Sequence, residues 1–534
     1  MQFDHLSLRD DVEVGRRLSA WLPQQRWFAT KSKRVASVAI VDGATIRETA
    51  DSVQFVALLS VKFEDGALDL YAVPLELASC GTQAMLAQVQ TSHGPLDLYE
   101  CLSSEFWLSL LTKLLVEGGA IQTDSGGELR AEVSRAFVPE HVMLCGPEDV
   151  AVHGGQQSNT SVSIGSSYFL KLFRRPQVGL NPDAEIGSFL TEHGYANTPA
   201  VAGTITYTPR DAEPRCLAIL SQRLVAESEA WSYCLKLLGQ FWQRLSQHSE
   251  LLKQAPKPVQ WRLDADRQDS SASEAPAAIS ELVRDSIHAA ALMGQRTAEL
   301  HLTLAEGTEA AFVPEPLTSS NLRQLVSLIQ SEIKTSEDLL AARRDVVASI
   351  GATKFAIEFA ARSTEFLNSL MSDDTEPGCS MIRVHGDYHL GQVLRTLDDF
   401  QIIDFEGEPD RPLVERRQKR PVFKDLAGML RSFHYASNAG AVGLIDALRD
   451  LPPQTDIAGW QQYWFSSVAR AFISTYSSAV ADRKLLPSDR PTAQRLLDVF
   501  LLEKALYELR YELNNRPDWA NIPIIGLSQT LGIE

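Results

Sequence analysis

Hydrophobic and polar positions alternate with a period of two in the first part of the chain, which predicts half-buried strands. The runs of this kind cover residues 34–46, 53–63, 68–75, 161–164 and 168–173. We expect a turn at Asp42-Gly43, and hairpin turns at Glu64-Asp65-Gly66 and Gly165-Ser166-Ser167. Helices are predicted over 104–117, behind a serine cap, and over 181–193, opened by Asn181-Pro182.

From Trp231 onward the apolar positions recur with helical spacing, most clearly over 279–305, 321–349 and 496–514. Segment 256–277 interrupts this pattern because it is rich in Pro, Ser, Asp and Ala, and we expect a loop there. The order of elements predicts an α+β protein of 534 residues in three parts. These parts are an α/β cap at 1–125, a β-rich nucleotide lobe at 126–226 and a helical lobe at 227–534.

Composition excludes several classes of protein. The chain has 50 Lys and Arg against 68 Asp and Glu, so its formal charge of −18 opposes binding to nucleic acid or to anionic membranes. Six cysteines form no CxxC pair, the first residues lack the apolar run of a signal peptide, and no segment reaches ~18 consecutive apolar residues. We therefore expect a soluble cytoplasmic protein with reduced thiols.

The strongest chemical signal is VHGDYHLGQ at 384–392, followed by IIDFEGEP at 402–409. Phosphoryl transfer needs a carboxylate beside the attacking hydroxyl, and oxygen ligands that hold Mg²⁺ against the nucleotide phosphates. Asp387, the amide of Gln392 five residues later and Asp404 seventeen residues later supply these groups in the order used by protein kinases. Either fragment alone is more often a plain turn; the two together favour a kinase site.

Upstream segments offer candidates for binding ATP. The polar loop 154–160, with Ser158, Asn159 and Thr160, precedes a strand and has the small residues that can surround phosphates, although a plain turn is the simpler interpretation. Lys171 lies in an apolar strand, and Glu185, fourteen residues later, lies in the next helix; we expect them to pair. The alternative for Lys171 is a side chain that reaches solvent from an edge strand. Gln222 and Leu224 follow a strand where a hinge between lobes would bind adenine.

Several segments together resemble the bacterial maltokinases. HGDYHLGQVL, IIDFEGEP, DLAGMLRSFHYAS (425–437) and EKALYELRYELNNRPDW (503–519) resemble their catalytic lobe. FLKLFRR (169–175) resembles their nucleotide lobe and QRWFATKSK (25–33) their N-terminal cap. The resemblance implies a bilobal, eukaryotic-protein-kinase-like fold and phosphorylation of maltose at its anomeric hydroxyl by ATP and Mg²⁺, in α-glucan metabolism. It also implies a trehalose synthase as a possible partner, which would be a separate chain.

Carried over by this resemblance, Asp387 is the catalytic base and Gln392 and Asp404 are metal ligands. His389 supports the loop, or is simply structural, and Glu406 is a nearby further ligand. Tyr388 stands where the family usually has Leu, and we expect this change to have little consequence.

The resemblance also implies a sugar site on the C-terminal helix. Lys504, Tyr507 and Tyr511 recur at i, i+3 and i+7 and therefore share one face. Helix packing is the ordinary reason for such a stripe, but this face meets the sugar in maltokinases. Arg431 and Tyr435 are weaker candidates for sugar contacts.

Two other functions stay open. One is a kinase for glucosamine or another monosaccharide, since related proteins share the cap and the motifs. The other is a catalytically dead, nucleotide-binding regulatory protein, which is disfavoured because Lys171, Asp387, Gln392 and Asp404 are all present. Asp404→Ala should abolish turnover if the chain is a kinase.

Overall fold

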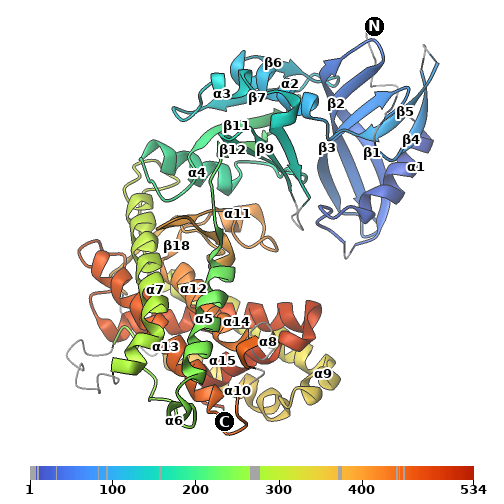
Figure 1. Cartoon of the computed structure of the whole chain (residues 1–534). Helices are drawn as coiled ribbons and strands as arrows, with labels where there is room; N and C mark the ends of the chain where they lie inside the picture. The colour runs from blue at the N-terminus through green and yellow to red at the C-terminus, as the bar shows by residue number, and fades with distance from the viewer. Residues whose placement is uncertain are drawn as a thin grey trace. The chain divides into compact units, whose positions relative to one another are not determined.

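The computed structural model forms two compact units, Met1–Leu224 and Val225–Glu534. It describes Leu8 and residues 11–533, apart from 32, 82, 92–93, 155–158, 265–276, 371–375, 440–442, 444–445 and 449–450. The first unit contains two antiparallel sheets, and the second is mainly helical (Figure 1). The boundaries predicted at 125/126 and 226/227 stay predictions.

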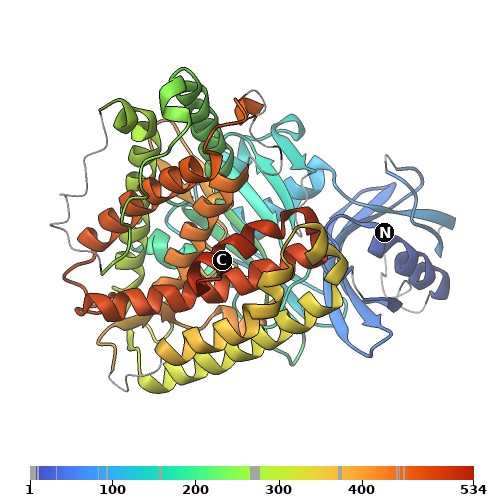
Figure 2. The ribbon, with the colours of Figure 1, turned by 90° about the horizontal axis from the view of Figure 1, so that it is seen from below.

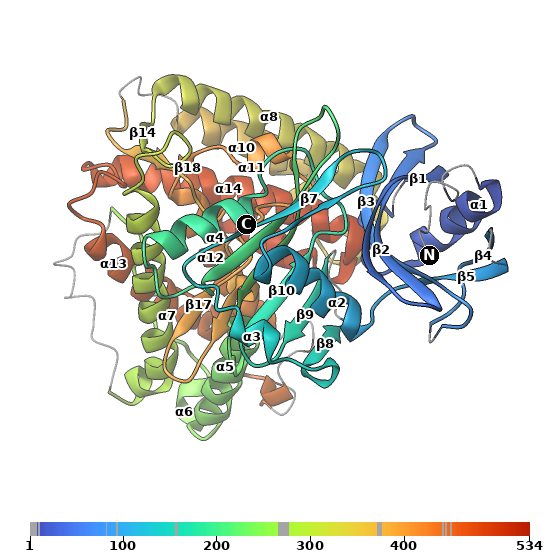
Figure 3. The ribbon, with the colours of Figure 1, turned by 90° about the horizontal axis from the view of Figure 1, so that it is seen from above.

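The first sheet of unit 1 has five strands in the order β1-β2-β3-β5-β4. The strands are β1 (Val35–Glu48), β2 (Ser52–Phe63), β3 (Leu68–Ala78), β4 (Ala87–Thr91) and β5 (Gly94–Glu100). Helix α1 (Val12–Trp21) packs against β1 and β4 (Figures 1 and 3). The predicted hairpin turn between β2 and β3 is confirmed, and Gly66 occupies its positive-φ position (φ 85°).

Strand β1 corrects one expectation, because the chain does not turn at Asp42-Gly43 but continues through it. The β1–β2 pairing shifts register between Ile40 and Asp42, so a bulge replaces the turn. The buried Asp42 carboxylate accepts hydrogen bonds from the hydroxyls of Thr123 and Tyr207, both at 2.7 Å. The Asp-Gly pair therefore supplies a buried polar anchor in a strand, where local sequence favours a turn.

The second sheet of unit 1 has seven strands in the order β6-β7-β11-β12-β10-β9-β8 (Figure 3). Its strands are β6 (Ala120–Gln122), β7 (Glu128–Val133), β8 (Val150–His153), β9 (Thr160–Ile164), β10 (Tyr168–Leu172), β11 (Val201–Thr208) and β12 (Arg215–Gln222). Its helices are α2 (Ser104–Leu111), α3 (Glu140–Met143) and α4 (Pro182–Glu192). Helix α4 begins at the expected place, because the Asn181 side chain accepts a hydrogen bond from the Asp183 N–H at 2.8 Å.

One hydrophobic core joins the two sheets of unit 1. It combines Val56 and Leu58 of the first sheet with Trp107 of α2 and Leu170 and Leu220 of the second sheet. All five side chains are buried. The two sheets are therefore parts of one packed body.

A buried arginine adds a polar connection inside unit 1. Arg174 follows β10, and its Nη2 donates to Glu100 at the end of β5 at 2.7 Å. Its Nε donates to the Thr160 hydroxyl at 2.7 Å, and its guanidinium carbon lies 4.3 Å from the Trp27 ring centroid. The charge is thereby compensated although the side chain is only 1% exposed.

Unit 2 is built from packed helices. They are α5 (Ala230–Ser246), α6 (Ser249–Leu252), α7 (Ala277–Leu304), α8 (Ser319–Ala342), α9 (Arg344–Ser349), α10 (Thr353–Leu370), α11 (Leu413–Arg416), α12 (Phe423–Asn438), α13 (Ile457–Ala479), α14 (Arg490–Asn515) and α15 (Asn521–Leu531). Helices α8 and α10 lie side by side (Figure 2, yellow). The single helix predicted over 321–349 is two helices, because the chain leaves helical geometry at Arg343 (φ −106°, ψ 36°).

Two small sheets complete unit 2 and hold its loops. One has the order β13 (Ser228–Glu229), β16 (Val393–Arg395), β17 (Phe400–Ile402); the other has β14 (Glu315–Pro316), β15 (Ser380–Ile382), β18 (Arg420–Pro421). The described part of the predicted loop 256–277 is irregular up to residue 264, and residues 265–276 lie outside the described residues. Among the described residues, no helix is both long and apolar enough to span a membrane.

Candidate active site

The HGD segment forms a loop that α12 holds by its first turn. The Asp425 carboxylate accepts the backbone N–H of His385 at 2.8 Å and that of Gly386 at 2.9 Å. His301 of α7 contacts the same carboxylate at 2.9 Å and so has a structural role. Gly386 has φ 85°, a conformation that side chains rarely tolerate. The loop therefore presents Asp387 from a backbone fixed by a buried anion.

The residue after Asp387 packs into the helical core. Tyr388 is 2% exposed and its hydroxyl lies 2.9 Å from the hydroxyl of Thr297 on α7. Gly428 of α12 lies directly against the Tyr388 carbonyl, and a Cβ there would collide with it. Tyr388 thus faces the core, and the small consequence expected of this residue stays a prediction.

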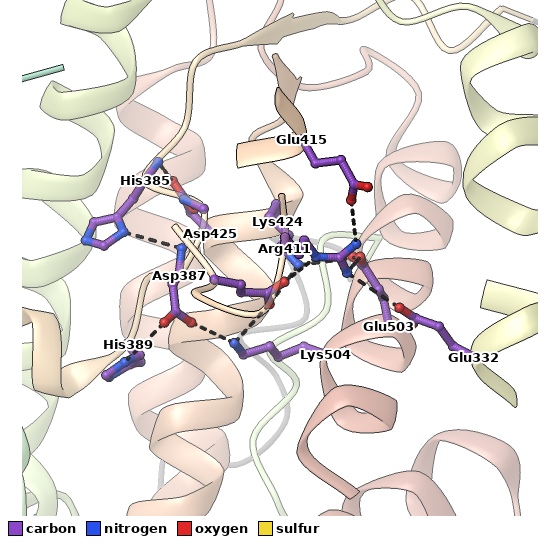
Figure 4. Close-up of polar contacts among 12 residues, drawn as sticks. Glu332, His385, Asp387, His389, Arg411, Glu415, Lys424, Asp425, Glu503 and Lys504 are labelled. Atoms are coloured by element: carbon purple, nitrogen blue, oxygen red, sulfur yellow. Dashed lines mark hydrogen bonds and ion pairs between the residues drawn. The ribbon is translucent and has the colours of Figure 1, made fainter. Parts of the chain in front are cut away.

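Asp387 lies between a histidine and a buried lysine (Figure 4). Its Oδ1 accepts a hydrogen bond from Lys504 Nζ at 2.9 Å, and its Oδ2 lies 3.9 Å from His389 Nε2. Burial alone would raise the pKa of Asp387, but the charge and hydrogen bond of Lys504, together with the nearby His389, outweigh it, so the pKa lies below its ordinary value. Asp387 is therefore ionised at neutral pH and can accept a hydrogen bond from a hydroxyl.

His389 supports the loop from within. Its Nδ1 accepts the N–H of Gly391 at 3.0 Å, which caps the short 3₁₀ turn Leu390–Gln392. Burial lowers the pKa of His389, so the ring is neutral at pH 7.

Glu408 is a site residue that sequence reasoning missed, although it stands in the IIDFEGEP motif. It is 2% exposed and contacts Lys504 Nζ at 3.3 Å, Lys424 Nζ at 3.1 Å and Arg411 Nε at 2.6 Å. Burial would raise the pKa of Glu408, but the three cations lower it further than burial raises it. Arg411 also contacts Glu503 at 3.1 Å, so the acids and bases form one buried network behind Asp387 (Figure 4).

The expected metal ligands lie at one end of a hairpin. Val393 of β16 pairs with Ile402 of β17, and the Ile403 N–H donates to the Gln392 carbonyl at 3.0 Å, so Gln392 and Asp404 lie at the same end. Asp404 has φ 68°, an uncommon conformation for a residue other than glycine. Side-chain oxygens of Asp404 and Glu406 lie within 4.8 Å of each other. Two carboxylates and an amide are oxygen donors that fit Mg²⁺.

In unit 1, Lys171 has a partner that sequence reasoning missed. Its Nζ lies 3.0 Å from Asp183 Oδ2, in the first turn of α4, two residues before the expected partner Glu185. Both side chains of this pair are mostly buried. Asp183 and Glu185 both lie in the first turn of α4, so either acid has a spacing from Lys171 that sequence can detect. The expected pairing of Lys171 with Glu185 stays a prediction.

The other predicted nucleotide contacts are distributed along unit 1. Thr160 begins β9 and its hydroxyl accepts the hydrogen bond from Arg174, while Ser158 lies outside the described residues. Asn159 directly precedes β9. Gln222 ends β12, and its N–H donates to the Ala200 carbonyl at 2.8 Å, two residues before Leu224 closes the unit.

The predicted sugar row lies on one face of α14, as the spacing required. Lys504 Nζ lies 4.8 Å from the Tyr507 ring centroid, and the Tyr507 and Tyr511 rings stack with centroids 6.4 Å apart. Lys504 is buried against Asp387, whereas Tyr511 is 42% exposed. The row thus runs from Asp387 toward solvent.

Arg431 and Tyr435 have another placement. Arg431 Nε donates to Glu508 at 2.8 Å and the Tyr435 hydroxyl donates to Glu512 at 3.2 Å. These bonds connect α12 to α14, one helical turn apart. The placement favours a helix-packing role for both residues.

Comparison with known proteins finds sequence matches to the N-terminal region and to longer parts of the chain. Residues 21–100 match the maltokinase N-terminal cap domain. A glucosamine kinase of Streptacidiphilus jiangxiensis is 29% identical over 158 residues, 30% of this chain and a third (33%) of that relative. A glucosamine kinase of Mycolicibacterium smegmatis is 22% identical over 384 residues, 70% of this chain and 78% of the relative.

Solved structures extend the similarity to the whole fold. The structure of a glucosamine kinase in complex with glucosamine, ADP and inorganic phosphate covers 96% of this chain and 98% of its own, with a TM-score of 0.59 and 18% identity. A second crystal form of a glucosamine kinase gives a TM-score of 0.61 over 97% of this chain and 99% of its own, also at 18% identity. The fold is therefore protein-kinase-like, and residues 21–100 match the maltokinase N-terminal cap domain.

Proposed function

We propose that this chain transfers the γ-phosphoryl group of ATP to a small sugar, with maltose as the acceptor at its anomeric hydroxyl. The observation that carries the proposal is the row on α14, because Lys504 bonds the catalytic carboxylate and the Tyr507 and Tyr511 rings continue from it. Stacked aromatic rings bind the apolar faces of sugars, and two rings in succession suit a disaccharide.

Asp387 accepts the hydrogen bond of the attacking hydroxyl and takes its proton as the phosphoryl group is transferred. Lys504 holds the carboxylate ionised and in one orientation, so the loop is prepared before the sugar binds. Catalysis by this arrangement is mainly positioning and electrostatic stabilisation.

Gln392, Asp404 and Glu406 would hold Mg²⁺, which when bound neutralises charge on the phosphates. Lys171, held by Asp183, would contact the nucleotide phosphates, and Gln222 and Leu224 would lie beside the base. A trehalose synthase partner stays a prediction of the maltokinase resemblance.

Glucosamine is the second candidate acceptor, because the two relatives compared above are glucosamine kinases. A local charge also supports it. Asp410 is an exposed carboxylate two residues after Glu408, which contacts Lys504 Nζ at 3.3 Å. An exposed carboxylate beside the sugar row could pair with the ammonium of an amino sugar, whereas maltose has no charge for it to bind.

ADP release by the purified chain with ATP and Mg²⁺ tests the reaction, using maltose, glucose, glucosamine, trehalose and no sugar. We expect turnover with maltose, and a fall in kcat of about 10²–10⁴-fold in Asp387→Asn with little change in nucleotide affinity. Loss of nucleotide binding with preserved turnover would contradict the role of Asp387. If no sugar supports ADP release, the alternative of a catalytically dead, nucleotide-binding protein would be favoured.

Asp410→Asn separates the two acceptors. If the substrate is glucosamine, its KM should rise about tenfold or more, because a charged hydrogen bond is lost. If the substrate is maltose, KM should change little. Asp338→Asn, a carboxylate change at an exposed position of α8, is the control for a general loss of charge.

A further inference from the structure

Unit 2 contains a cavity of about 420 Å³. Its walls come from α12, α13, α14, α15 and the segment 258–262. On α14 its wall is Asp498, Leu501 and Ala505. At 100° per residue, these positions lie on a different face of α14 from Lys504, Tyr507 and Tyr511. The cavity is therefore distinct from the site at Asp387, which is not among its lining residues.

The irregular segment that forms one wall is held in place by side chains of the helices beneath it. The Ala255 N–H donates to Asp456 at 3.1 Å, the Val259 N–H to Ser466 at 2.9 Å and the Leu263 N–H to Gln494 at 2.6 Å. Three such bonds fix the backbone on both sides of Trp261, so this wall exists before any ligand binds.

The lining combines aromatic rings with carboxamides. Trp261 packs edge-on against Phe465, with ring centroids 5.8 Å apart, and Trp261 is partly exposed. Gln461 and Gln529 line the same cavity from α13 and α15. Each side-chain amide has hydrogen-bond donors and an acceptor, so it can bond to two neighbouring hydroxyls of a sugar. The face of the Trp261 indole can stack on the C–H face of a sugar ring.

The charges of the lining are already paired. Arg431 donates to Glu508 at 2.8 Å, and Arg262 donates to Asp498 at 3.1 Å. A paired guanidinium has little charge left for an anion, so the cavity suits a neutral ligand better than a phosphate.

One buried donor in the wall has no partner. His434 is 4% exposed, and burial places its pKa well below the ordinary value, so the ring is neutral. Arg431 Nη1 lies 3.3 Å from His434 Nδ1, which must accept because a guanidinium can only donate. Nε2 therefore carries the proton, and it has no hydrogen-bond partner among the described residues. A buried donor without an acceptor is costly unless a ligand or water supplies one.

We propose that this cavity is a non-catalytic binding site for a neutral sugar, stacked on Trp261 and hydrogen-bonded by Gln461, Gln529 and His434. The site does not depend on the proposed acceptor, since none of these residues contacts Asp387. Its ligand is a neutral polyhydroxy compound of one or two sugar rings.

Saturation-transfer NMR with maltose tests the proposal in a Tyr507→Ala background, which weakens the α14 site. We expect maltose signals to persist there, and its apparent Kd to rise at least about tenfold when Trp261→Ala is added. Gln461→Ala, which removes one amide and no ring, should raise Kd about three- to tenfold. Thermal unfolding of each variant checks that the fold is kept.

Three results would overturn the site. They are an equal Kd with and without Trp261→Ala in folded protein, equal binding of glycerol, and inorganic phosphate binding in preference to maltose. Trp261→Ala alone should leave kcat and KM for the acceptor unchanged, and a parallel loss of turnover would place the cavity in the catalytic machinery instead. Failure of every sugar as an acceptor would leave this binding measurement intact, so the two proposals fail separately.

Discussion

At the scale of single residues, Lys504 controls the charge state of the Asp387 carboxylate. Its ammonium is buried between Asp387 at 2.9 Å and Glu408 at 3.3 Å. Burial would lower the pKa of Lys504, but the two carboxylates raise it well above its ordinary value. The lysine thus stays charged, and its charge keeps Asp387 ionised.

Lys504→Met should lower kcat/KM by about 10²-fold and move the acid limb of its pH profile to higher pH. The sign follows because Lys504 lowers the pKa of Asp387; without it the carboxylate is protonated at a higher pH and activity is lost sooner on acidification. Lys504→Arg keeps the charge and is the control. An acid limb that does not move would show that Asp387 is not the group that titrates.

At the scale of elements, the first turn of α12 determines where the catalytic loop lies. Asp425 combines two backbone hydrogen bonds from the loop with a contact to His301 of α7. An anion in the first turn also matches the positive end of the helix dipole. Contacts from α12, rather than contacts within the loop, therefore fix the backbone of the loop that carries Asp387.

Asp425→Ala should destabilise the folded protein by about 3–5 kcal/mol at neutral pH, because it leaves two buried N–H groups and His301 unpaired. Burial would raise the pKa of Asp425, but the His301 hydrogen bond and nearby charges lower it below 3.8. Its stabilising contribution is therefore complete above about pH 4 and is lost as pH falls further. The difference in Tm between wild type and variant should shrink below that pH. Asp338→Ala, an exposed change on α8, should leave Tm within about 1 °C.

At the scale of the whole molecule, the shared core of unit 1 predicts that cap and nucleotide lobe unfold together. Trp107→Ala should cost about 3–5 kcal/mol, because a fully buried tryptophan leaves a cavity in this core. Hydrogen exchange should then speed up in both β2 and β11. Leu68→Ala, at a side chain 67% exposed, is the control and should change neither strand. Faster exchange in one sheet alone would show two separate cooperative units.

Sequence alone determined the features that depend on local spacing. Periodicity and capping act between residues a few positions apart. They predict strand β10, helix α4 with its Asn181 cap, and the common face of Lys504 and Tyr507. The five-residue spacing between Asp387 and Gln392 is also a local feature, because both residues belong to one continuous loop that leads into a hairpin.

Tertiary structure decided the partners. Asp183 contacts Lys171, Glu408 lies among three cations, and Asp425 anchors a loop about forty residues away in sequence. Asp42 is in a bulged strand because Thr123 and Tyr207 reach its carboxylate. Such contacts join distant segments, and their energy depends on burial and side-chain direction, neither of which a local pattern contains.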